Sequence, residues 1–546
     1  MAYVHPVFSY VAPPELSGKK ARRQVVIAGA GPIGLCAAID LAQHDVPTVV
    51  VDDDNTVSVG SRAICYAKRT LEILDRLGCG ADVVDKGVQW HVGRVFFHDR
   101  EAYRFDLLPE PGHCRPAFVN LQQYHFEEIL VERALRAGVE LRWRHQVVGV
   151  APHDDEVSVD IETRDGRYSL DTDWLIAADG SRSTVRKLLG LDTEGHVFHD
   201  RFLIADIRMT SAFPTERWFW FDPPFHPGQS VLLHRQADDI WRVDFQLGAD
   251  ADPDEEKKPE RILPRLTAML GKDARFEIVW ASVYTFRCQR MQHFRHGRVL
   301  FAGDSAHLVS PFGARGANSG IQDVDNLVWK LTLVARDIAP ERLLDTYDDE
   351  RTRAADENIL HSTRATDFIS PKSAVSRVFR DAVLELARRY PFARRLVNSG
   401  RLSTASVLDR SLLNTPDAPG AFADAPTAPV PGTVVVDAPV VGPRGQWLHD
   451  YLGGTFVLLA FDPAIAGDQV AALSRDTIPC AVVSVGGDAI EGAMRIEDRD
   501  GLASERYDGK PGTVYLFRPD QHVCARWRAF DLEHVRAAIA RATCTA

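Results

Sequence analysis

A glycine-rich turn between two short apolar runs constrains the fold of this chain more than any other feature. Residues 24–28 form the first run, residues 35–42 carry apolar side chains at helical spacing, and residues 48–51 form the second run. The glycines of the turn are Gly29, Gly31 and Gly34. Buried parallel strands have continuous apolar sequences of this kind. The segment therefore predicts a strand–helix–strand unit in a mostly parallel α/β sheet.

The spacing of these glycines is typical of a dinucleotide-binding turn. Gly29 permits the sharp turn, Gly31 lets a pyrophosphate approach the backbone, and Gly34 lets the helix pack closely on the strand. The N-terminus of the helix offers N–H donors and a partial positive charge to phosphates. Asp52 ends the second strand, where a carboxylate can accept hydrogen bonds from a ribose. The alternative is a purely structural turn, and the motif alone does not separate FAD from NAD.

Length, charge and cysteine usage limit the classes of protein that remain. A chain of 546 residues predicts two to four domains. The net charge of −12 argues against nucleic acid as a partner. The eight cysteines include no Cys-x-x-Cys pair, which favours free thiols in a reducing compartment. We see neither a signal peptide nor an apolar run of the ~20 residues that a membrane span needs, so we expect a cytoplasmic protein without a membrane partner.

Composition shifts along the chain predict several regions. Alternating strands from about residue 90 to 290 predict an antiparallel sheet inserted into the first domain. Five prolines among small and polar residues predict a linker, and strand and helix patterns follow it. The predicted regions are a loose leader (1–23), a nucleotide-binding domain (24–415) with an interleaved substrate-binding sheet (approximately 90–120 and 190–290), the linker (416–431) and a small α/β domain (432–546).

Two further segments place glycine and aspartate at the ends of apolar strands. Asp179 and Gly180 follow the run 174–178, and a polar tail continues to Arg186. Gly303 and Asp304 follow the run 298–302. This last segment, the third counting from the Gly29 turn, continues into the start of a helix through Pro311, Gly313, Gly316, Ala317 and Asn318.

In this order the three segments resemble the FAD-dependent aromatic hydroxylases, which are single-component flavoprotein monooxygenases. Residues 517–527 are similar to the end of the C-terminal domain in the phenol hydroxylase and 3-(3-hydroxyphenyl)propionate hydroxylase branch. The resemblance implies an α/β fold: a Rossmann-like FAD-binding domain, an inserted antiparallel-sheet substrate domain and a C-terminal thioredoxin-like domain. Cys480 and Cys524 lie too far apart for a redox pair, so we expect that last domain to support a lid or an oligomer.

The resemblance also implies which residues bind FAD. Asp304 would bind the ribityl chain, and the segment from Asp179 would serve the flavin and the reduced nicotinamide. The helix that follows residue 316 would stabilise negative charge on the reduced flavin ring. Arg315 departs from the family pattern, and it could meet an anionic substrate, the flavin or solvent. The implied cofactor residues are Gly29, Gly31, Gly34, Asp52, Arg62, Gln123, Asp179, Gly180, Arg186, Gly303, Asp304, Gly313, Gly316, Ala317 and Asn318. A surface-helix role is the alternative for Gln123.

The implied chemistry is reduction of FAD by NADH or NADPH, reaction with O2 to a C4a-hydroperoxide, and oxygen transfer to a phenolate. Arg242 would orient the flavin, Tyr284 would contact the substrate, and Pro311 would form a wall of the pocket. His234 could accept the phenolic proton near neutral pH. A satisfied core side chain is the alternative for both His234 and Tyr284.

Other functions stay open. The same cofactor could serve a Baeyer–Villiger or epoxidising oxygenase or a hydroxylase of polycyclic antibiotics, and a non-catalytic flavin redox module is a rival from another class. No metal site is expected, because the run 52–54 is acidic but consecutive acids on one loop seldom converge. We expect a homodimer, and the sequence does not separate NADH from NADPH.

Overall fold

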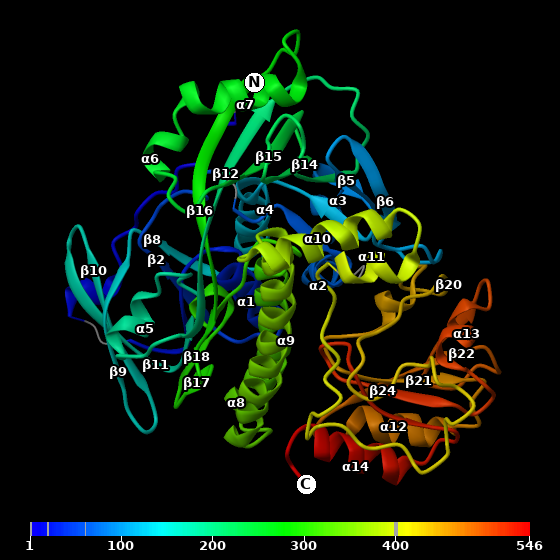
Figure 1. The fold of residues 1–546 in the computed structure, drawn as a ribbon. Helices are drawn as coiled ribbons and strands as arrows, with labels where there is room; N and C mark the ends of the chain where they lie inside the picture. The colour runs from blue at the N-terminus through cyan, green and yellow to red at the C-terminus, as the bar shows by residue number, and fades with distance from the viewer. Residues whose placement is uncertain (1–2, 19–20, 61, 398–401) are drawn as a thin grey trace.

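The computed structural model describes residues 3–18, 21–60, 62–397 and 402–546, and its main layers are three large sheets with helices around them (Figure 1). In the first sheet, β1 (Arg22–Ala28) pairs in parallel with β2 (Thr48–Asp52) and with β11 (Gly166–Ala177), and β11 pairs in parallel with β18 (Val299–Phe301). The other strands of this sheet are β8 (Glu140–Trp143), β9 (Gln146–Pro152), β10 (Val157–Thr163) and β17 (Arg295–His296).

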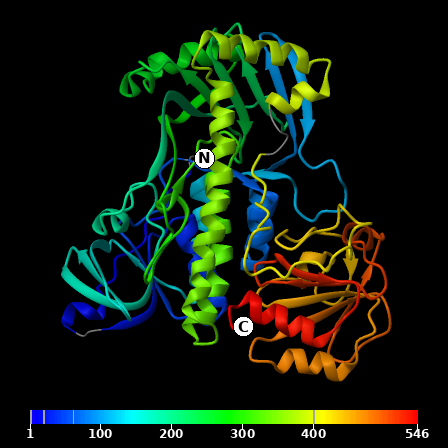
Figure 2. The same cartoon turned by 60° about the horizontal axis from the view of Figure 1, so that its bottom comes forward.

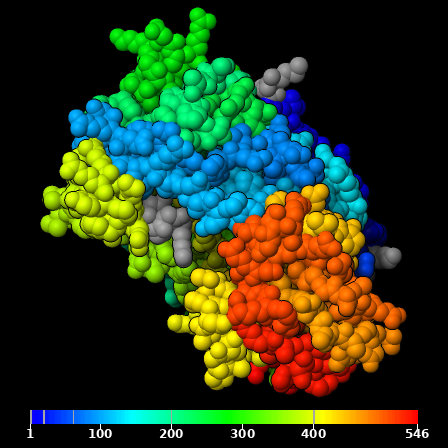
Figure 3. Space-filling model, turned by 90° about the vertical axis from the view of Figure 1, so that its right-hand side faces the viewer, coloured from blue at the N-terminus to red at the C-terminus, as the bar shows by residue number. Residues whose placement is uncertain are grey.

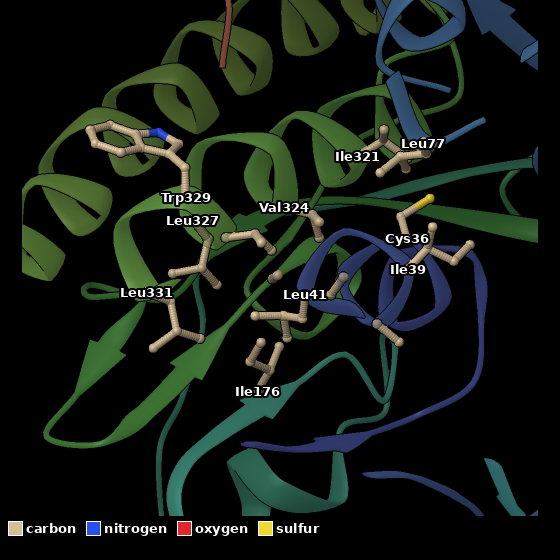
Figure 4. Packing of buried hydrophobic residues seen from close by; sticks show 14 of the residues in the cluster. Cys36, Ile39, Leu41, Leu77, Ile176, Ile321, Val324, Leu327, Trp329 and Leu331 are labelled. Atoms are coloured by element: carbon tan, nitrogen blue, oxygen red, sulfur yellow. The ribbon is translucent and has the colours of Figure 1, made fainter. Parts of the chain in front are cut away.

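Two helices form the main core against this sheet. Figure 4 shows apolar side chains of α1 (Pro32–Gln43) and α8 (Gly316–Ala335) meeting close to Ile176 of β11. Burial of a single Leu or Ile side chain is worth about 1.5–3 kcal/mol, so this packing fixes α8 on the sheet. Trp329 points away from that cluster and meets Phe456, at 6.0 Å between ring centroids. The helix α8, whose first residues belong to the third sequence segment, is therefore packed on both sides.

The second sheet is inserted into the first domain and is antiparallel except for one parallel pair, β5 with β13. One of its faces carries an apolar cluster that packs on α7 (Pro259–Leu270), and the other face looks toward the first sheet. Trp218, Trp220 and Phe225 belong to the α7 cluster and are core residues. The strands in spatial order are β19 (His307–Leu308), β16 (Glu277–Arg290), β12 (Glu194–Arg208), β15 (Ile240–Leu247), β14 (Ser230–Arg235), β13 (Arg217–Phe221), β5 (Val92–Phe97) and β6 (Arg100–Asp106).

A long helix, α9 (Asp345–Ile369), runs between the second sheet and the lower part of the molecule (Figure 2). A small sheet of β3 (Cys65–Ala67), β7 (Phe118–Asn120) and β4 (Val88–Trp90) lies beside the first domain. The remaining helices before the C-terminal domain are η1 (Pro14–Ser17), α2 (Lys68–Leu77), α3 (Gly80–Lys86), α4 (Gln123–Arg136), α5 (Thr184–Leu188), α6 (Pro253–Glu256), η2 (Gly303–Ser305), η3 (Glu341–Leu344), α10 (Ala374–Ala387) and α11 (Pro391–Val397).

The C-terminal domain is a six-stranded mixed sheet with helices, and it lies against the first domain (Figure 3). Its resemblance to thioredoxin stays a prediction. The predicted linker, 416–431, contains neither helix nor strand, yet Phe422 is buried in it beneath Arg526 and Arg528, so the segment is packed on this sheet. The elements are β20 (Val440–Val441), η4 (Leu448–Tyr451), β21 (Phe456–Phe461), α12 (Gly467–Arg475), β22 (Cys480–Val485), β23 (Met494–Asp498), α13 (Leu502–Tyr507), β24 (Val514–Phe517), β25 (Val523–Trp527) and α14 (Leu532–Ala542).

The N-terminal leader differs from the loose segment that its composition predicts. Phe8 stacks on Trp143 with ring centroids 4.4 Å apart, and the buried Glu15 accepts hydrogen bonds from Arg142 at 3.1 Å. A paired buried carboxylate and a stacked ring hold the described part of the leader along β8. Among the described residues, no helix is long and apolar enough to cross a membrane.

Candidate active site

A cavity of about 810 Å³ lies between the carboxyl ends of the parallel strands and the inner face of the second sheet. This volume falls in the range of small-molecule and cofactor sites, about 300–1,000 Å³. All three glycine-and-aspartate segments contribute to its walls. The predicted residues that line it are Gly29, Gly31, Asp52, Arg62, Gln123, Asp179, Gly180, His234, Arg242, Tyr284, Asp304, Pro311, Gly316, Ala317 and Asn318.

Glycine is needed for different steric reasons at the three positions of the first segment. A Cβ on Gly34 would lie 1.9 Å from the carbonyl oxygen of Gly29, and a Cβ on Gly29 would lie 2.5 Å from that of Ala178. Gly29 also has a φ of +104°, which L side chains rarely adopt. A Cβ on Gly31, in contrast, would meet nothing within 4 Å. Gly29 and Gly34 therefore serve packing, while Gly31 leaves room for a ligand at the start of α1.

Asp52 holds the glycine turn as well as lining the cavity. Its Oδ2 accepts a hydrogen bond from the N–H of Ala30 at 2.6 Å, and its Oδ1 accepts one from the N–H of Asp54 at 2.8 Å. Burial raises the pKa of Asp52 to about 6, although these two hydrogen bonds act to lower it. A ribose hydroxyl would have to share oxygens that the backbone already uses.

In the second segment, one buried polar atom of a cavity-lining side chain has no hydrogen-bond partner within the described residues. Asp179 accepts a hydrogen bond from the N–H of Val185 through Oδ2 at 3.0 Å, and within the described chain its buried Oδ1 has no hydrogen-bond partner. Burial raises the pKa of Asp179. Gly180 has a φ of +75°, and a Cβ there would meet nothing within 4 Å. The segment thus offers an open backbone and an unsatisfied carboxylate oxygen.

Arg186 is predicted to bind the cofactor, but it lies outside the cavity wall. It donates hydrogen bonds to the backbone carbonyls of Ser305, at 2.6 Å, and Ser181, at 3.0 Å. Its guanidinium therefore ties the second segment to the third, and its direct contact with the cofactor stays a prediction. Gly34, Gly303 and Gly313 likewise lie outside the lining residues.

In the third segment, Asp304 projects its side chain toward the cavity. The surrounding protein raises the pKa of Asp304 by burial. Gly303 has a φ of +65°, and a Cβ there would lie 2.8 Å from Ile33 of α1. Close packing of η2 on α1 thus presents the carboxylate of Asp304 beside the glycine turn.

Asn318 lines the cavity, but its side chain is already fully bonded. Its Oδ1 accepts from the N–H of Ala67 at 2.8 Å and from Thr70 Oγ1 at 2.7 Å. Its Nδ2 donates to the carbonyls of Cys65 at 2.8 Å and Ala314 at 2.6 Å. These four bonds use both lone pairs and both N–H donors of the amide. A ligand can therefore use the backbone N–H of residues 316–318, which lack intrahelical acceptors, rather than the Asn318 side chain.

Gln123 and Arg62 lie on opposite sides of one loop. Gln123, the first residue of α4, accepts a hydrogen bond from the N–H of Ala63 at 3.1 Å and donates one to Glu127 at 2.8 Å. Glu127 in turn accepts from the N–H of Ser58 at 2.5 Å. The two side chains hold the loop, which leaves the exposed Arg62 on the cavity wall.

Arg242 is fixed by a buried ion pair that the sequence does not reveal. Its Nε and Nη2 each donate to Asp206 at 2.8 Å, and Nη1 lies 3.5 Å from the carbonyl of Arg62. The guanidinium also lies over the ring of Trp280, 5.7 Å from the ring centroid. A bidentate pair of this kind sets both the position and the plane of the arginine.

The surroundings of His234 argue against its predicted role as a proton acceptor. This side chain is 3% exposed and lines the cavity, but burial and the nearby Arg217 and Arg242 lower its pKa well below the ordinary value. A neutral imidazole with so low a pKa is a weak proton acceptor near neutral pH. Burial also raises the pKa of Tyr284, with a contribution from Asp304, so this phenol stays protonated.

Arg315 is buried rather than directed to solvent. Its Nη1 donates to Asn358 Oδ1 at 2.9 Å, and burial lowers its pKa. Because Arg315 also lines the cavity, the solvent-exposed alternative is wrong, and contact with the flavin or with an anionic substrate remains.

Three charged residues of the cavity face were missed: Asp206, Arg217 and Asp244. Alternation along β15 places Asp244 on the same face as Arg242. Strand pairing places Asp206 directly opposite Arg242. Charges on strands that are otherwise apolar are uncommon unless they are paired or functional. Within the described residues, no group of three or more His, Cys, Asp or Glu side chains could hold a metal ion.

Known proteins share this architecture. Residues 22–362 match a family model described as an FAD binding domain. The chain is 36% identical over 395 residues to a 6-methylpretetramide 4-monooxygenase of Streptomyces rimosus, which spans 69% of this chain and 68% of the relative. It is 28% identical over 524 residues to a 3-(3-hydroxy-phenyl)propionate/3-hydroxycinnamic acid hydroxylase of Mycolicibacterium smegmatis, with 91% and 89% covered.

A solved structure, that of the flavin-dependent monooxygenase PieE in complex with FAD and substrate, shares the fold. Its TM-score is 0.81 at 23% identity, over 96% of this chain and 99% of that one. The family model covers more than half of the chain, and the Streptomyces relative exceeds 30% identity over two thirds of it. The chain therefore belongs to the FAD-binding-domain family of FAD-dependent aromatic monooxygenases.

Proposed function

We propose that the protein hydroxylates a phenolic ring with O2, with NADH or NADPH as the reductant. The observation that carries this proposal is a single cavity whose one end has the three cofactor-type segments and whose other end has polar and aromatic side chains of the second sheet. Such a cavity can hold a cofactor ring and an aromatic substrate side by side. A homodimer is part of the same proposal.

The residues present fit FAD. Gly31 and Gly180 leave open space, and Asp179 presents an unsatisfied buried oxygen. The pyrophosphate would lie at Gly31 and the start of α1, the adenosine ribose at Asp52 and the ribityl chain at Asp304. Bound FAD would supply hydride acceptance from the nicotinamide and activation of O2.

The protein would contribute orientation, charge stabilisation and exclusion of water. The free N–H groups of residues 316–318 and the α8 dipole favour negative charge at the adjacent ring. Arg242, held by Asp206, keeps the loop with Arg62 in place. Tyr284 stays protonated and can donate a hydrogen bond to a substrate oxygen, and Pro311 closes the wall beside it.

Two substrate sizes follow from the relatives. The mycobacterial relative is named for a single-ring phenol, which supports a simple phenolic substrate. The Streptomyces relative is named for 6-methylpretetramide, which supports a polycyclic phenol as the second candidate. A Baeyer–Villiger reaction or a redox module without turnover remains a weaker alternative.

The test is NADH and NADPH oxidation by the purified holoenzyme with single-ring and polycyclic phenols, with hydroxylated product measured in parallel. Stimulation by one phenol with an equal amount of product supports the proposal and identifies the substrate class. Stimulation without product identifies an effector that uncouples reduction from oxygen transfer. Reducible FAD with no response to any phenol would refute phenol hydroxylation.

A further inference from the structure

Three polar side chains on the cavity face have no hydrogen-bond partner in the described chain: Arg217, His234 and Asp244. Arg217 is 9% exposed and His234 is 3% exposed, and both line the cavity with Asp244. Nδ1 of His234 and Oδ1 of Asp244 are buried and unsatisfied. The electrostatic neighbours of Arg217 are Cys65 and Asp244, without a hydrogen bond to either.

Strand register brings the three side chains together on one face. His234 of β14 pairs with Arg242 of β15, and Asp244 lies two residues further along β15, on the same face. On the neighbouring strand, Trp218 pairs with Leu233, which puts Arg217 beside His234. The three residues are therefore adjacent on three consecutive strands.

The neighbouring charged pair on the same face is fully bonded, in contrast with these three side chains. Arg242 and Asp206 lie on the same face and satisfy each other in bidentate geometry. Buried polar groups are hydrogen-bonded in the great majority of cases, and each unsatisfied group costs about 1–3 kcal/mol, or more when charged. Three adjacent exceptions that all face one cavity indicate groups whose partners come from a bound molecule.

The chemistry of the three groups defines that molecule. Arg217 only donates hydrogen bonds and carries a positive charge, so it requires an acceptor oxygen. Asp244 offers acceptor oxygens, and burial raises its pKa to about 7, with Arg242 and Arg217 opposing the rise and Asp206 adding to it. His234 is neutral and can donate or accept. The complementary ligand carries an acceptor oxygen and a hydroxyl on neighbouring positions.

We propose that Arg217, His234 and Asp244 form the recognition site for the substrate, and that the substrate is an aromatic ring with a carbonyl or carboxylate oxygen next to a hydroxyl. The acceptor oxygen binds Arg217, the hydroxyl donates to Asp244, and His234 bridges the two. This inference rests on the proposed function, because it names the substrate class of the same cavity. It also gives a role to charged groups that lie unpaired beside the bidentate pair of Arg242 and Asp206.

The test measures binding to the holoenzyme by calorimetry, apart from turnover. The four probes are 2-hydroxybenzoate (carboxylate and hydroxyl), 2-hydroxyacetophenone (ketone and hydroxyl), phenol (no second oxygen) and 2-methoxybenzoate (no hydroxyl). Wild type should bind at least one of the first two about tenfold more tightly than phenol. The ratio between the first two distinguishes a carboxylate from a ketone as the acceptor.

Two variants and a matched control separate recognition from structure. Arg217→Met should weaken the two-oxygen probes by about 10- to 100-fold and phenol by less than threefold. Asp244→Leu should weaken the hydroxyl probes and spare 2-methoxybenzoate. Arg208→Met, at the end of β12 and outside the cavity lining, removes an exposed ion pair with Glu277 and should leave all four affinities unchanged. Arg217→Lys should restore part of the selectivity if Arg217→Met folds poorly.

Stability distinguishes the two roles of Arg217. Because its guanidinium has no partner to lose, Arg217→Met should keep or raise the Tm of the ligand-free enzyme. A lower Tm with unchanged ratios among the four probes would overturn the proposal, since it would show a structural arginine. Altered probe ratios with no hydroxylated product from any phenol would leave the recognition site standing and refute the proposed function. Normal product formation with unaltered affinity ratios among the four probes would support the proposed function and refute the recognition site.

Discussion

Alanine substitutions at Gly34 and Gly31 should have different consequences: the first should impair folding, and the second should weaken FAD binding. A Cβ on Gly34 would lie 1.9 Å from the carbonyl oxygen of Gly29, which is about 1.5 Å inside ordinary contact distance. Overpacking of this kind costs about 1–3 kcal/mol and sometimes more, and a backbone carbonyl cannot rotate away as a side chain can. Gly34→Ala should therefore lower the Tm of the apoprotein by several degrees or prevent folding.

Gly31→Ala should leave the apoprotein intact and weaken FAD. Gly31 is the N-cap of α1 with φ −75° and ψ −177°, and a Cβ there meets nothing within 4 Å. Only a cap preference is lost, so apoprotein stability should change by about 1 kcal/mol or less. If a pyrophosphate lies against this backbone, the methyl group should raise the Kd for FAD by about 10- to 100-fold, which is about 1.4–2.8 kcal/mol.

The assay is fluorescence titration of each apoprotein with FAD, together with thermal unfolding followed by circular dichroism. Gly29→Ala serves as a second control, because its Cβ would lie 2.5 Å from the carbonyl of Ala178 and its φ is +104°. A Gly31→Ala protein with wild-type affinity for FAD would refute the pyrophosphate position. A Gly34→Ala protein with an unchanged Tm would refute the packing argument.

Three further predictions concern other parts of the molecule. Asp304→Ala should weaken FAD retention, because it removes the carboxylate expected at the ribityl chain, and a variant that purifies fully loaded with FAD would contradict that role. Glu350→Gln removes the carboxylate that accepts a hydrogen bond from the fully buried Arg518 at 2.7 Å. The free energy of unfolding, measured with denaturant, should fall by about 3–5 kcal/mol. A fall below about 1 kcal/mol would argue against a stabilising pair. Burial alone would lower the pKa of His449, but the carboxylates of Asp437, 3.3 Å from its Nδ1, and Asp75, 3.4 Å from its Nε2, raise it to about 10. The folded-state pKa therefore lies above the unfolded value of about 6.5, so the stabilisation is complete below pH 6.5 and lost as pH rises toward 10. The Tm difference between wild type and His449→Gln should shrink over that range, and a constant difference would contradict it.

The parts of the fold that the sequence predicts are those governed by local rules. The run 24–28 and the strand β1 nearly coincide, and the run 48–51 becomes β2. Buried parallel strands are continuously apolar, and tight turns require glycine for steric reasons that act within a few residues. The family and the resident cofactor follow from the same local segments.

The sequence does not show the hydrogen bonds of buried polar side chains, because their partners lie far away along the chain. Asn318 finds its hydrogen bonds at residues 65–70, and Arg186 finds one at Ser305. A motif can place such a residue near a cofactor, but it cannot show whether the side chain is already bonded. Arg217 and Asp244 of the proposed recognition site were missed for the same reason, since only strand register reveals that they share a face.

Hydrogen bonds between residues far apart in the sequence also connect the C-terminal domain to the turn at the start of α8. Thr70 of α2 donates to Asn318, and its neighbour Arg69 donates to Gln521 Oε1 at 2.6 Å and to the carbonyl of Asp520 at 2.8 Å. Arg69 is also paired with Asp325 of α8 at 2.8 Å. Two consecutive residues of one helix therefore bond the start of α8 and the turn between β24 and β25. Removal of the C-terminal domain would leave the buried Arg69 with part of its hydrogen-bonding capacity unsatisfied beside the turn that faces the cavity, at a cost comparable to that of other broken buried pairs. The domain is thus part of the support of that turn.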